Sequence, residues 1–331
     1  MGKASPTMRD VAQLAGVSQA TVSYVLNGTA SISQEVKARV HAAIQALNYK
    51  PNYNAKALKT RSSDIVGVII PDITNQYYAR LLQILEEALH ARNRRVVIYS
   101  TAYRPEIEEN AIASLTACNA YAIITLYQFT NPKCWEQLRA TRRPAVAIEG
   151  GSACAQYGIP CVNVDSHLGG YMAARHLLGL GRRRIAYVHQ NSGIDALQER
   201  MSGYIEAMRA VGLFREEDIF VTRNPNDKWN EGKTLGKLLA RCPYDGIITS
   251  SDLIAIGIIK ELQACGRRVP DDVAVVGYDD VPVAELFIPA LTTIAQPVSE
   301  ICTLALEAIF HDEKSAPLPT LQPQLIKRDS A

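Results

Sequence analysis

Several features are missing from this 331-residue chain, and each absence argues against a class of protein. No apolar run reaches the roughly 18 residues that cross a bilayer, and the N-terminus lacks the apolar core of a signal peptide. The seven cysteines are odd in number and scattered, without a CxxC pair. Such spacing argues against a disulfide framework or a metal site. We therefore expect a soluble, cytoplasmic protein whose cysteines are small core residues.

Motifs of catalysis are missing as well. The chain has no strand-linked GxGxxG, no HExxH and no nucleophile elbow. Gly232-Lys233-Thr234 is similar to the end of a phosphate loop, but Asp227 stands where that loop requires its earlier glycine. The sequence therefore predicts no enzyme activity, no cofactor and no metal.

What is present is a basic N-terminal region. Residues 1–61 hold eight lysines and arginines against two acids, a net charge of +6, whereas the remainder carries −4. A basic head on a mildly acidic body fits a polyanion bound at one end only.

Two short helical patterns in this region, Met8–Ala15 and Ser18–Leu26, are separated only by Gly16 and Val17. So short a link forces the helices to cross and pack, which predicts a helix-turn-helix. Thr7 and Asp10 have the spacing of a capping pair, and Gly16 suits a left-handed C-cap.

The two helices divide into an apolar and a polar face. We expect a core of Val11, Leu14, Ala15, Val17, Val22 and Leu26. The outer face is short and rich in hydrogen-bonding groups, as a major-groove reader requires; it holds Gln19, Ala20, Thr21, Ser23 and Tyr24. A helical hairpin with a merely solvated face would show the same pattern.

A third amphipathic helix is predicted after Ser33, its expected N-cap, and ends before Pro51. The polar, basic run that follows is either a linker or a helix that forms only on DNA. We place a three-helix head at residues 1–50, a linker at 51–61 and a body at 62–331.

From Ile65 onward, short β-branched apolar runs alternate with helical patterns, which predicts an α/β body of doubly wound parallel sheets. The first unit is expected to have strands at 65–71, 96–100, 122–126 and 145–148. A second unit is expected from 161–164, with strands at 184–189, 219–222, 246–250 and 273–278, and segments after 292 able to cross back. Two units in series predict two lobes, and residues just after the strands should line the cleft between them.

The head resembles the lactose-repressor (LacI) family of bacterial transcription regulators through DVAQLAGVSQATVSYVLNG and ISQEVKARVHAAIQALNYKPN. The body is similar to the same family through VGVIIPDITNQYYARLL, SSDLIAIGIIKELQACGRRVPDDVAVVGYDD and TTIAQP. The resemblance covers essentially the whole chain. It implies a homodimeric repressor that binds a pseudo-palindromic operator, and a periplasmic-binding-protein-like body that closes on a small effector.

For the DNA side, the resemblance implies base contacts by Gln19, Ala20 and Tyr24, and phosphate contacts by Ser18, Thr21, Ser23 and Asn27. It maps a hinge helix onto Asn52–Lys59, with DNA contacts by Ala55, Lys56 and Leu58 and with Leu58 wedged between the central base pairs. Tyr24 departs from the arginine or histidine of many members. Tyrosine cannot make arginine's bidentate pair with guanine, so the half-site cannot be copied from a relative.

For the effector side, the resemblance together with the strand ends points to nine residues. Arginine forks and carboxylates suit a polyhydroxylated ligand, and a tryptophan can stack on a sugar face. The candidates in the second lobe are Arg200, Trp229, Asp252 and Asp279, and those in the first are Asn75, Tyr77, Tyr78, Tyr127 and Glu149. The alternative role of Asp252 is to cap the helix that follows it, and that of Trp229 is simple packing.

The effector class stays open between a sugar and a nucleobase or nucleoside acting as corepressor. A transport-associated sugar-binding protein would share the two lobes, but it would need a signal peptide and have no use for a basic head.

Overall fold

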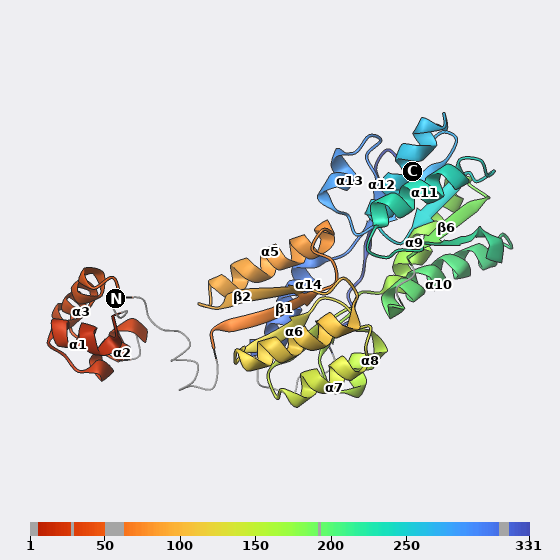
Figure 1. Cartoon of the computed structure of the whole chain (residues 1–331). Coiled ribbons are helices and arrows are strands. Elements are labelled where there is room, and N and C mark those ends of the chain that lie inside the picture. The colour runs from red at the N-terminus through yellow and green to blue at the C-terminus, as the bar shows by residue number, and fades with distance from the viewer. Residues whose placement is uncertain (1–5, 28–29, 50–62, 191–192, 311–317) are drawn as a thin grey trace. The chain divides into compact units, whose positions relative to one another are not determined.

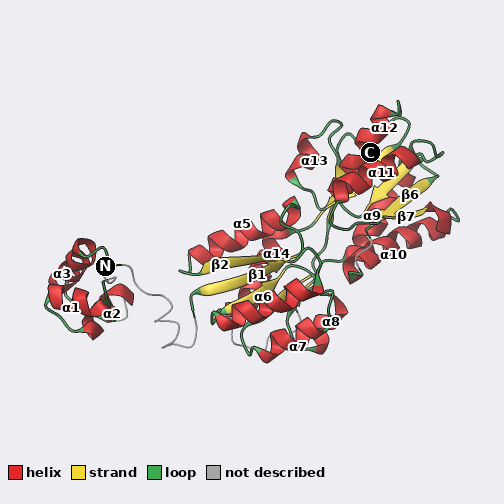
Figure 2. Cartoon of the chain, in the orientation of Figure 1, coloured by secondary structure: helices red, strands yellow, loops and turns green. Residues whose placement is uncertain are grey.

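The computed structural model describes residues 6–27, 30–49, 63–190, 193–310 and 318–331. The chain divides into two compact units, residues 1–63 and 64–331. In the described residues, the first unit is helical and the second surrounds strands with helices (Figure 2). No helix among the described residues combines the length and the apolar character that crossing a membrane requires.

The first unit contains α1 (Met8–Ala15), α2 (Gln19–Asn27) and α3 (Gln34–Ala46). Their shared core is built on Val11, Val22 and Val40, which are fully buried. Three helices around one small apolar core form the head that the sequence predicts.

Local capping fixes the helix boundaries. The Thr7 amide donates to the Asp10 carboxylate at 2.8 Å, and the Asp10 amide donates back to the Thr7 hydroxyl at 3.4 Å. Gly16 ends α1 at a φ of 64°, which a side chain would disfavour. Ser33 caps α3 by accepting from the Val36 amide. These three predicted caps are confirmed.

Leu14 corrects one expectation, because it is 56% exposed. The buried side of α1 runs through Val11, Ala12 and Ala15. At about 100° per residue, Leu14 lies roughly 100° from the centre of this buried side, just beyond its edge.

The second unit begins with lobe 1, a parallel sheet ordered β2-β1-β3-β4-β5. Its strands are β1 (Ile65–Ile70), β2 (Arg95–Ser100), β3 (Ala122–Thr125), β4 (Ala145–Ile148) and β5 (Cys161–Val162). Its helices are α5 (Gln76–His90), α6 (Pro105–Ala117), α7 (Lys133–Ala140) and α8 (Gly151–Gln156). Figure 1 shows α5 and α6 on opposite sides of this sheet.

Lobe 2 has a sheet ordered β11-β10-β9-β8-β6-β7, parallel except for β11. Its strands are β6 (Ile185–His189), β7 (Ile219–Val221), β8 (Gly246–Thr249), β9 (Ala274–Tyr278), β10 (Thr292–Ala295) and β11 (Gln324–Ile326). Its helices are α9 (Ser166–Gly179), α10 (Asp195–Ala210), η1 (Glu216–Asp218), α11 (Lys228–Leu239), α12 (Asp252–Ala264) and α13 (Pro282–Leu286).

The prediction that residues 161–164 open the second unit is wrong. Cys161 and Val162 pair with Ala147 and Ile148 of β4, at the edge of the lobe 1 sheet. A short apolar run does not say which sheet it joins, because that choice depends on pairing and not on composition. The chain therefore crosses to lobe 2 only after Val162.

The predicted return crossing is observed. Helix α14 (Val298–Phe310) packs on α5 and β4 of lobe 1, and Figure 1 shows it beside α5. The chain then returns to lobe 2 as β11. Because the chain crosses between the lobes repeatedly, their facing strand ends form a cleft.

Candidate functional site

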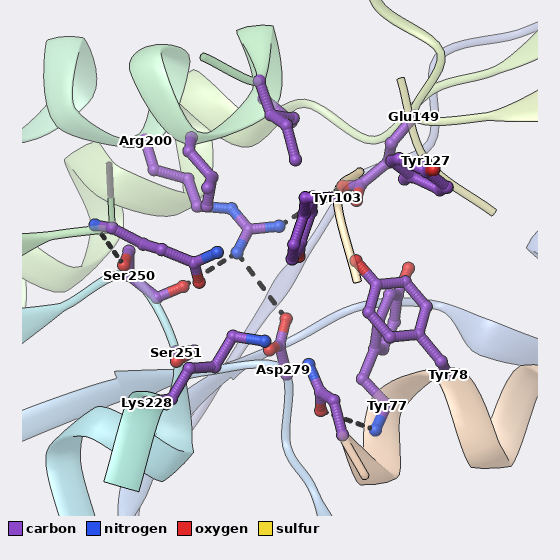
Figure 3. Close-up of a pocket in the computed structure, with 15 residues that line it drawn as sticks. Tyr77, Tyr78, Tyr103, Tyr127, Glu149, Arg200, Lys228, Ser250, Ser251 and Asp279 are labelled. Atoms are coloured by element: carbon purple, nitrogen blue, oxygen red, sulfur yellow. Dashed lines mark hydrogen bonds and ion pairs between the residues drawn. The ribbon is translucent and has the colours of Figure 1, made fainter. Parts of the chain in front are cut away.

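A small cavity lies where the carboxyl ends of the two sheets face each other (Figure 3). Among its lining residues are seven of the predicted effector contacts, namely Asn75, Tyr77, Tyr78, Tyr127, Glu149, Arg200 and Asp279. The open volume is about 30 Å³, room for one or two water molecules. The chain's own side chains thus fill most of this cavity, and a larger hollow of about 610 Å³, which shares Glu149 and Ala196 with it, lies beside it.

Arg200 of α10 is at the centre of the cavity wall. Its Nη2 donates to Glu149 Oε1 at 3.3 Å across the lobes, and its Nη1 lies 3.6 Å from Asp279 Oδ1. Nη1 also donates to the Ser250 carbonyl at 2.9 Å. Burial lowers the pKa of Arg200, but Tyr278 and the two carboxylates raise it by more than burial lowers it. The net pKa is raised, so the guanidinium stays charged.

Both carboxylates stand at strand ends with unusual backbone angles. Glu149 follows β4 with a φ of 51°, and Asp279 follows β9 with a φ of 107°. Such angles are uncommon for residues with a side chain and concentrate at functional sites. Burial raises the pKa of Asp279 to about 6, although Arg200 opposes the shift.

The tyrosines present rings more than hydroxyls to the cavity. The Tyr127 hydroxyl donates to the buried Glu108 at 2.7 Å and lies 2.6 Å from Thr101 Oγ1. The Tyr77 hydroxyl donates to Gln296 at 3.1 Å. Since these hydroxyls already have partners, the free contribution of the two residues is an aromatic surface.

An ion pair joins the lobes at one side of the cavity. Lys228 Nζ, at the start of α11, lies 3.3 Å from Asp72 Oδ2, which follows β1. Both side chains are largely buried, at 5% and 12% exposure. This contact and the Arg200–Glu149 pair hold the two lobes together in the observed conformation.

Three polar atoms of the lining have no hydrogen-bond partner within the described part of the chain. They are Gln190 Nε2, Arg200 Nε and Ser251 Oγ. Buried polar groups are normally paired, so these atoms favour a polar ligand.

Asp252 and Trp229, two of the predicted contacts, are not among the residues that line this cavity. Asp252 is fully buried and accepts from the Val281 amide at 2.9 Å and the Thr293 hydroxyl at 2.5 Å. These hydrogen bonds connect the start of α12 to Val281, which follows β9, and to Thr293 of β10. Trp229 packs against the main apolar core, and its carbonyl abuts Gly257 of α12. Both residues thus have packing or hydrogen-bonding roles within lobe 2, and their ligand contacts stay predictions.

Sequence reasoning missed several lining residues, notably Tyr103, Gln190, Lys228, Ser250 and Ser251. Ser250 and Ser251 directly follow β8, so the strand-end rule could have found them. Lys228 precedes Trp229, and neighbouring helical side chains point about 100° apart. The pattern carried no comparable signal for Tyr103.

In the head, α2 carries most of the predicted DNA contacts. Gln19, Ala20 and Tyr24 are exposed, with Tyr24 at 46%. Ser18 caps α2 through the Thr21 amide at 3.1 Å, and its hydroxyl lies 2.9 Å from Thr21 Oγ1. Ser23 is half-buried on the same helix. Asn27 is its last residue. The predicted hinge, with Ala55, Lys56 and Leu58, lies outside the described residues.

Comparisons with known proteins agree with this organisation. Residues 7–52 match the model for bacterial regulatory proteins of the lacI family, and residues 174–331 match a periplasmic binding protein-like domain. The ribose operon repressor of Halalkalibacterium halodurans is 31% identical over 314 residues, 95% of this chain and 92% of that protein. This chain belongs to the LacI family.

Solved structures of the LacI family have the same fold. A transcriptional regulator CelR–cellobiose complex matches with a TM-score of 0.71 and 28% identity, covering 98% of this chain and all of that one. The lac repressor bound to ONPG in the repressed state has a TM-score of 0.85 at 22% identity, over 99% and 100% of the two chains. The protein is thus a transcription regulator with a DNA-binding head and a ligand-binding body. It is not an enzyme.

Proposed function

We propose that this LacI-family regulator is a cytoplasmic, homodimeric repressor whose affinity for a pseudo-palindromic operator is set by a sugar bound between the lobes. The observation that carries the proposal is Arg200, held between Glu149 and Asp279 in a buried cleft. A planar donor fork beside two carboxylates matches the paired hydroxyls of a sugar. The named relatives are consistent with this class, since one is a ribose operon repressor and another is a complex with cellobiose.

The remaining cleft groups fit a polyol better than a strongly charged molecule. Arg200 and Lys228 are already matched by Glu149, Asp279 and Asp72. The unpartnered lining atoms in the described part of the chain are neutral groups on Gln190 and Ser251, apart from Arg200 Nε. An uncharged, hydrogen-bonding ligand satisfies these atoms without adding an uncompensated charge.

On the DNA side, we propose that Gln19, Ala20 and Tyr24 contact base edges from the exposed face of α2. Ser18, Thr21, Ser23 and Asn27 then contact phosphates. Ala55, Lys56 and Leu58 act at the centre of the operator, with Leu58 between the base pairs. Dimerisation places two heads on two half-sites, as the symmetry of such operators requires.

A thermal-shift screen of the purified protein against sugars and nucleosides tests the effector class. A ligand at 100 times its dissociation constant adds about 2.7 kcal/mol to the free energy of unfolding, so a true effector gives a clear shift. Arg200→Ala should abolish the shift, whereas Arg209→Ala, exposed on the same helix, should retain it. A shift only with nucleosides would replace the sugar proposal.

Selection of bound duplexes from a random pool tests the DNA side. The full protein should enrich a pseudo-palindromic sequence, and Tyr24→Ala should relax the preference at one position per half-site, by less than the about 1–3 kcal/mol of a bidentate pair. Enrichment of no sequence would refute the proposal.

A further inference from the structure

The amino-end edge of the lobe 1 sheet is unusually basic. The connections before its parallel strands all emerge at this edge, and with the first strand residues they carry five arginines and one acid. These residues are Arg92, Arg94, Arg95, Arg142 and Arg143, with Asp64 as the acid. Arg139 adds a further exposed charge in the last turn of α7. We call these six arginines the basic edge.

The corresponding edge of lobe 2 provides an internal comparison. Its connections and first strand residues carry seven arginines but also six acids. Arg268, for example, lies 2.6 Å from Asp272 and 3.4 Å from Asp271. Arginines alone are therefore common at such edges, and the excess of arginines over acids distinguishes lobe 1.

Two arginines of the basic edge contact aromatic rings. Arg94 lies 3.7 Å from the centre of the Tyr121 ring. Arg92 lies 5.4 Å from that of Phe310 and donates to the Ala88 carbonyl. The Tyr121 and Phe310 rings are stacked, with centres 5.6 Å apart. Rings and carbonyls orient a guanidinium without cancelling its charge.

The one acid of the edge pairs with Arg95. This arginine makes two hydrogen bonds to Asp64, at 2.8 and 2.6 Å. Arg143 donates instead to the Asn119 side chain at 3.0 Å and to the Ala120 carbonyl. Arg92, Arg139 and Arg142 are exposed. The edge thus presents positive charge to solvent.

The chain itself indicates which polyanion comes near. Asp64 directly precedes β1, so the connection from the DNA-binding head enters the body at this same edge. Residues 50–62 can span at most about 45 Å. Once the head holds a duplex, that duplex lies within tether reach of the basic edge, and it carries one phosphate per about 1.7 Å of axis.

We infer that the basic edge is a second DNA-contacting surface, which binds the phosphate backbone of the duplex held by the head. It contributes sequence-independent affinity, and it reads no bases. The inference rests on DNA binding by the head in the proposed function.

The test is the salt dependence of binding to a random-sequence duplex, measured by fluorescence anisotropy with the full chain. The double variant Arg139→Gln/Arg142→Gln removes two exposed charges whose guanidinium groups make no hydrogen bond or ion pair with the described residues. The control Arg241→Gln/Lys260→Gln removes two exposed charges from lobe 2. Both variants change the net charge equally, so only the position differs.

The lobe 1 variant should have a salt slope that is shallower by about 0.9 for each phosphate it no longer neutralises, and its affinity at 50 mM salt should fall by up to about tenfold per phosphate. The control should match the wild type. Equal slopes in all three proteins, or an equal fall in affinity in both variants, would overturn the inference. Failure of the wild type to bind any duplex would instead overturn the proposed function.

Discussion

The Lys228–Asp72 ion pair offers a direct way to perturb the closure of the two lobes. The pair joins α11 of lobe 2 to the end of β1 in lobe 1 at 3.3 Å. Burial raises the pKa of Asp72, but Lys228 and the hydrogen bonds from Thr74 outweigh this, and the net pKa is lowered. Asp72 is therefore ionised at neutral pH and depends on its partner.

Lys228→Met leaves the Asp72 carboxylate buried without a counter-charge. Removing one member of a buried pair costs about 3–5 kcal/mol, but here the lobes can open and return Asp72 to water. The penalty therefore shifts the balance between closed and open lobes by on the order of 10²- to 10³-fold. The double variant Asp72→Asn/Lys228→Met removes both charges and should restore closure.

Tryptophan fluorescence reports the change, since the chain has two tryptophans. Trp135 is fully buried in lobe 1, and Trp135→Phe leaves Trp229, next to Lys228, as the only tryptophan emitter. Lys228→Met should change the emission of Trp229, whose neighbour in the chain pairs across the lobes, and the double variant should reverse the change. Lys237→Met is the control, since the exposed Lys237 lies 4.0 Å from Glu261 within lobe 2. Additive effects of the two single substitutions would refute coupling between the charges.

Three further outcomes are expected in urea titrations. Gly170→Ala should lower the free energy of unfolding by about 1–3 kcal/mol, because a Cβ at this position overlaps the Arg200 carbonyl. Gly179→Ala in the same helix is the control, since its Cβ meets nothing within 4 Å. Equal decreases in the two variants would contradict this packing. The pKa of Asp279 is raised to about 6 in the folded protein. Its stabilising contribution to the free energy of unfolding is therefore full below about pH 3.8 and is lost as the pH rises through 6. Asp279→Asn should therefore remove up to about 3 kcal/mol of pH dependence in that window, and parallel wild-type and variant profiles would disprove the assignment. Asp252→Ala should lower the free energy of unfolding by about 2–5 kcal/mol, because it leaves two buried donors without an acceptor. Asp252→Asn should keep the effector response. Loss of that response in a folded Asp252→Asn protein would indicate that Asp252 contacts the ligand.

The head was predictable because its determinants are local. The Thr7–Asp10 capping box and the left-handed Gly16 depend on residues within one helical turn. Leu14 was misplaced because the choice between two neighbouring faces of α1 is made by α3, which packs against α1. The spacing of apolar residues indicates that a helix has an apolar face, and tertiary packing decides which residues lie at the centre of that face.

The cleft was predictable in part, because seven of its lining residues were proposed from the sequence and several others, such as Gln190 and Lys228, were not. Parallel strands end at one edge, so Glu149 and Asp279 were found from their strands together with the family resemblance. The hydrogen bonds of Asp252 were not predictable because its partners, Val281 and Thr293, lie far along the chain. Its neighbour Ser251 lines the cavity instead, and no sequence pattern shows which of two adjacent polar residues turns inward.

The filled cleft constrains how an effector acts. A ligand shifts a conformational equilibrium only by its differential affinity for the two states, and the observed closed state leaves about 30 Å³, far below the roughly 300 Å³ of small-molecule pockets. The proposed sugar does not fit this cavity as observed, so in the proposed function it requires the Arg200–Glu149 contact to lengthen or the lobes to separate. Because lobe 1 carries the connection to the head and the basic edge, any rotation of this lobe against lobe 2 moves both.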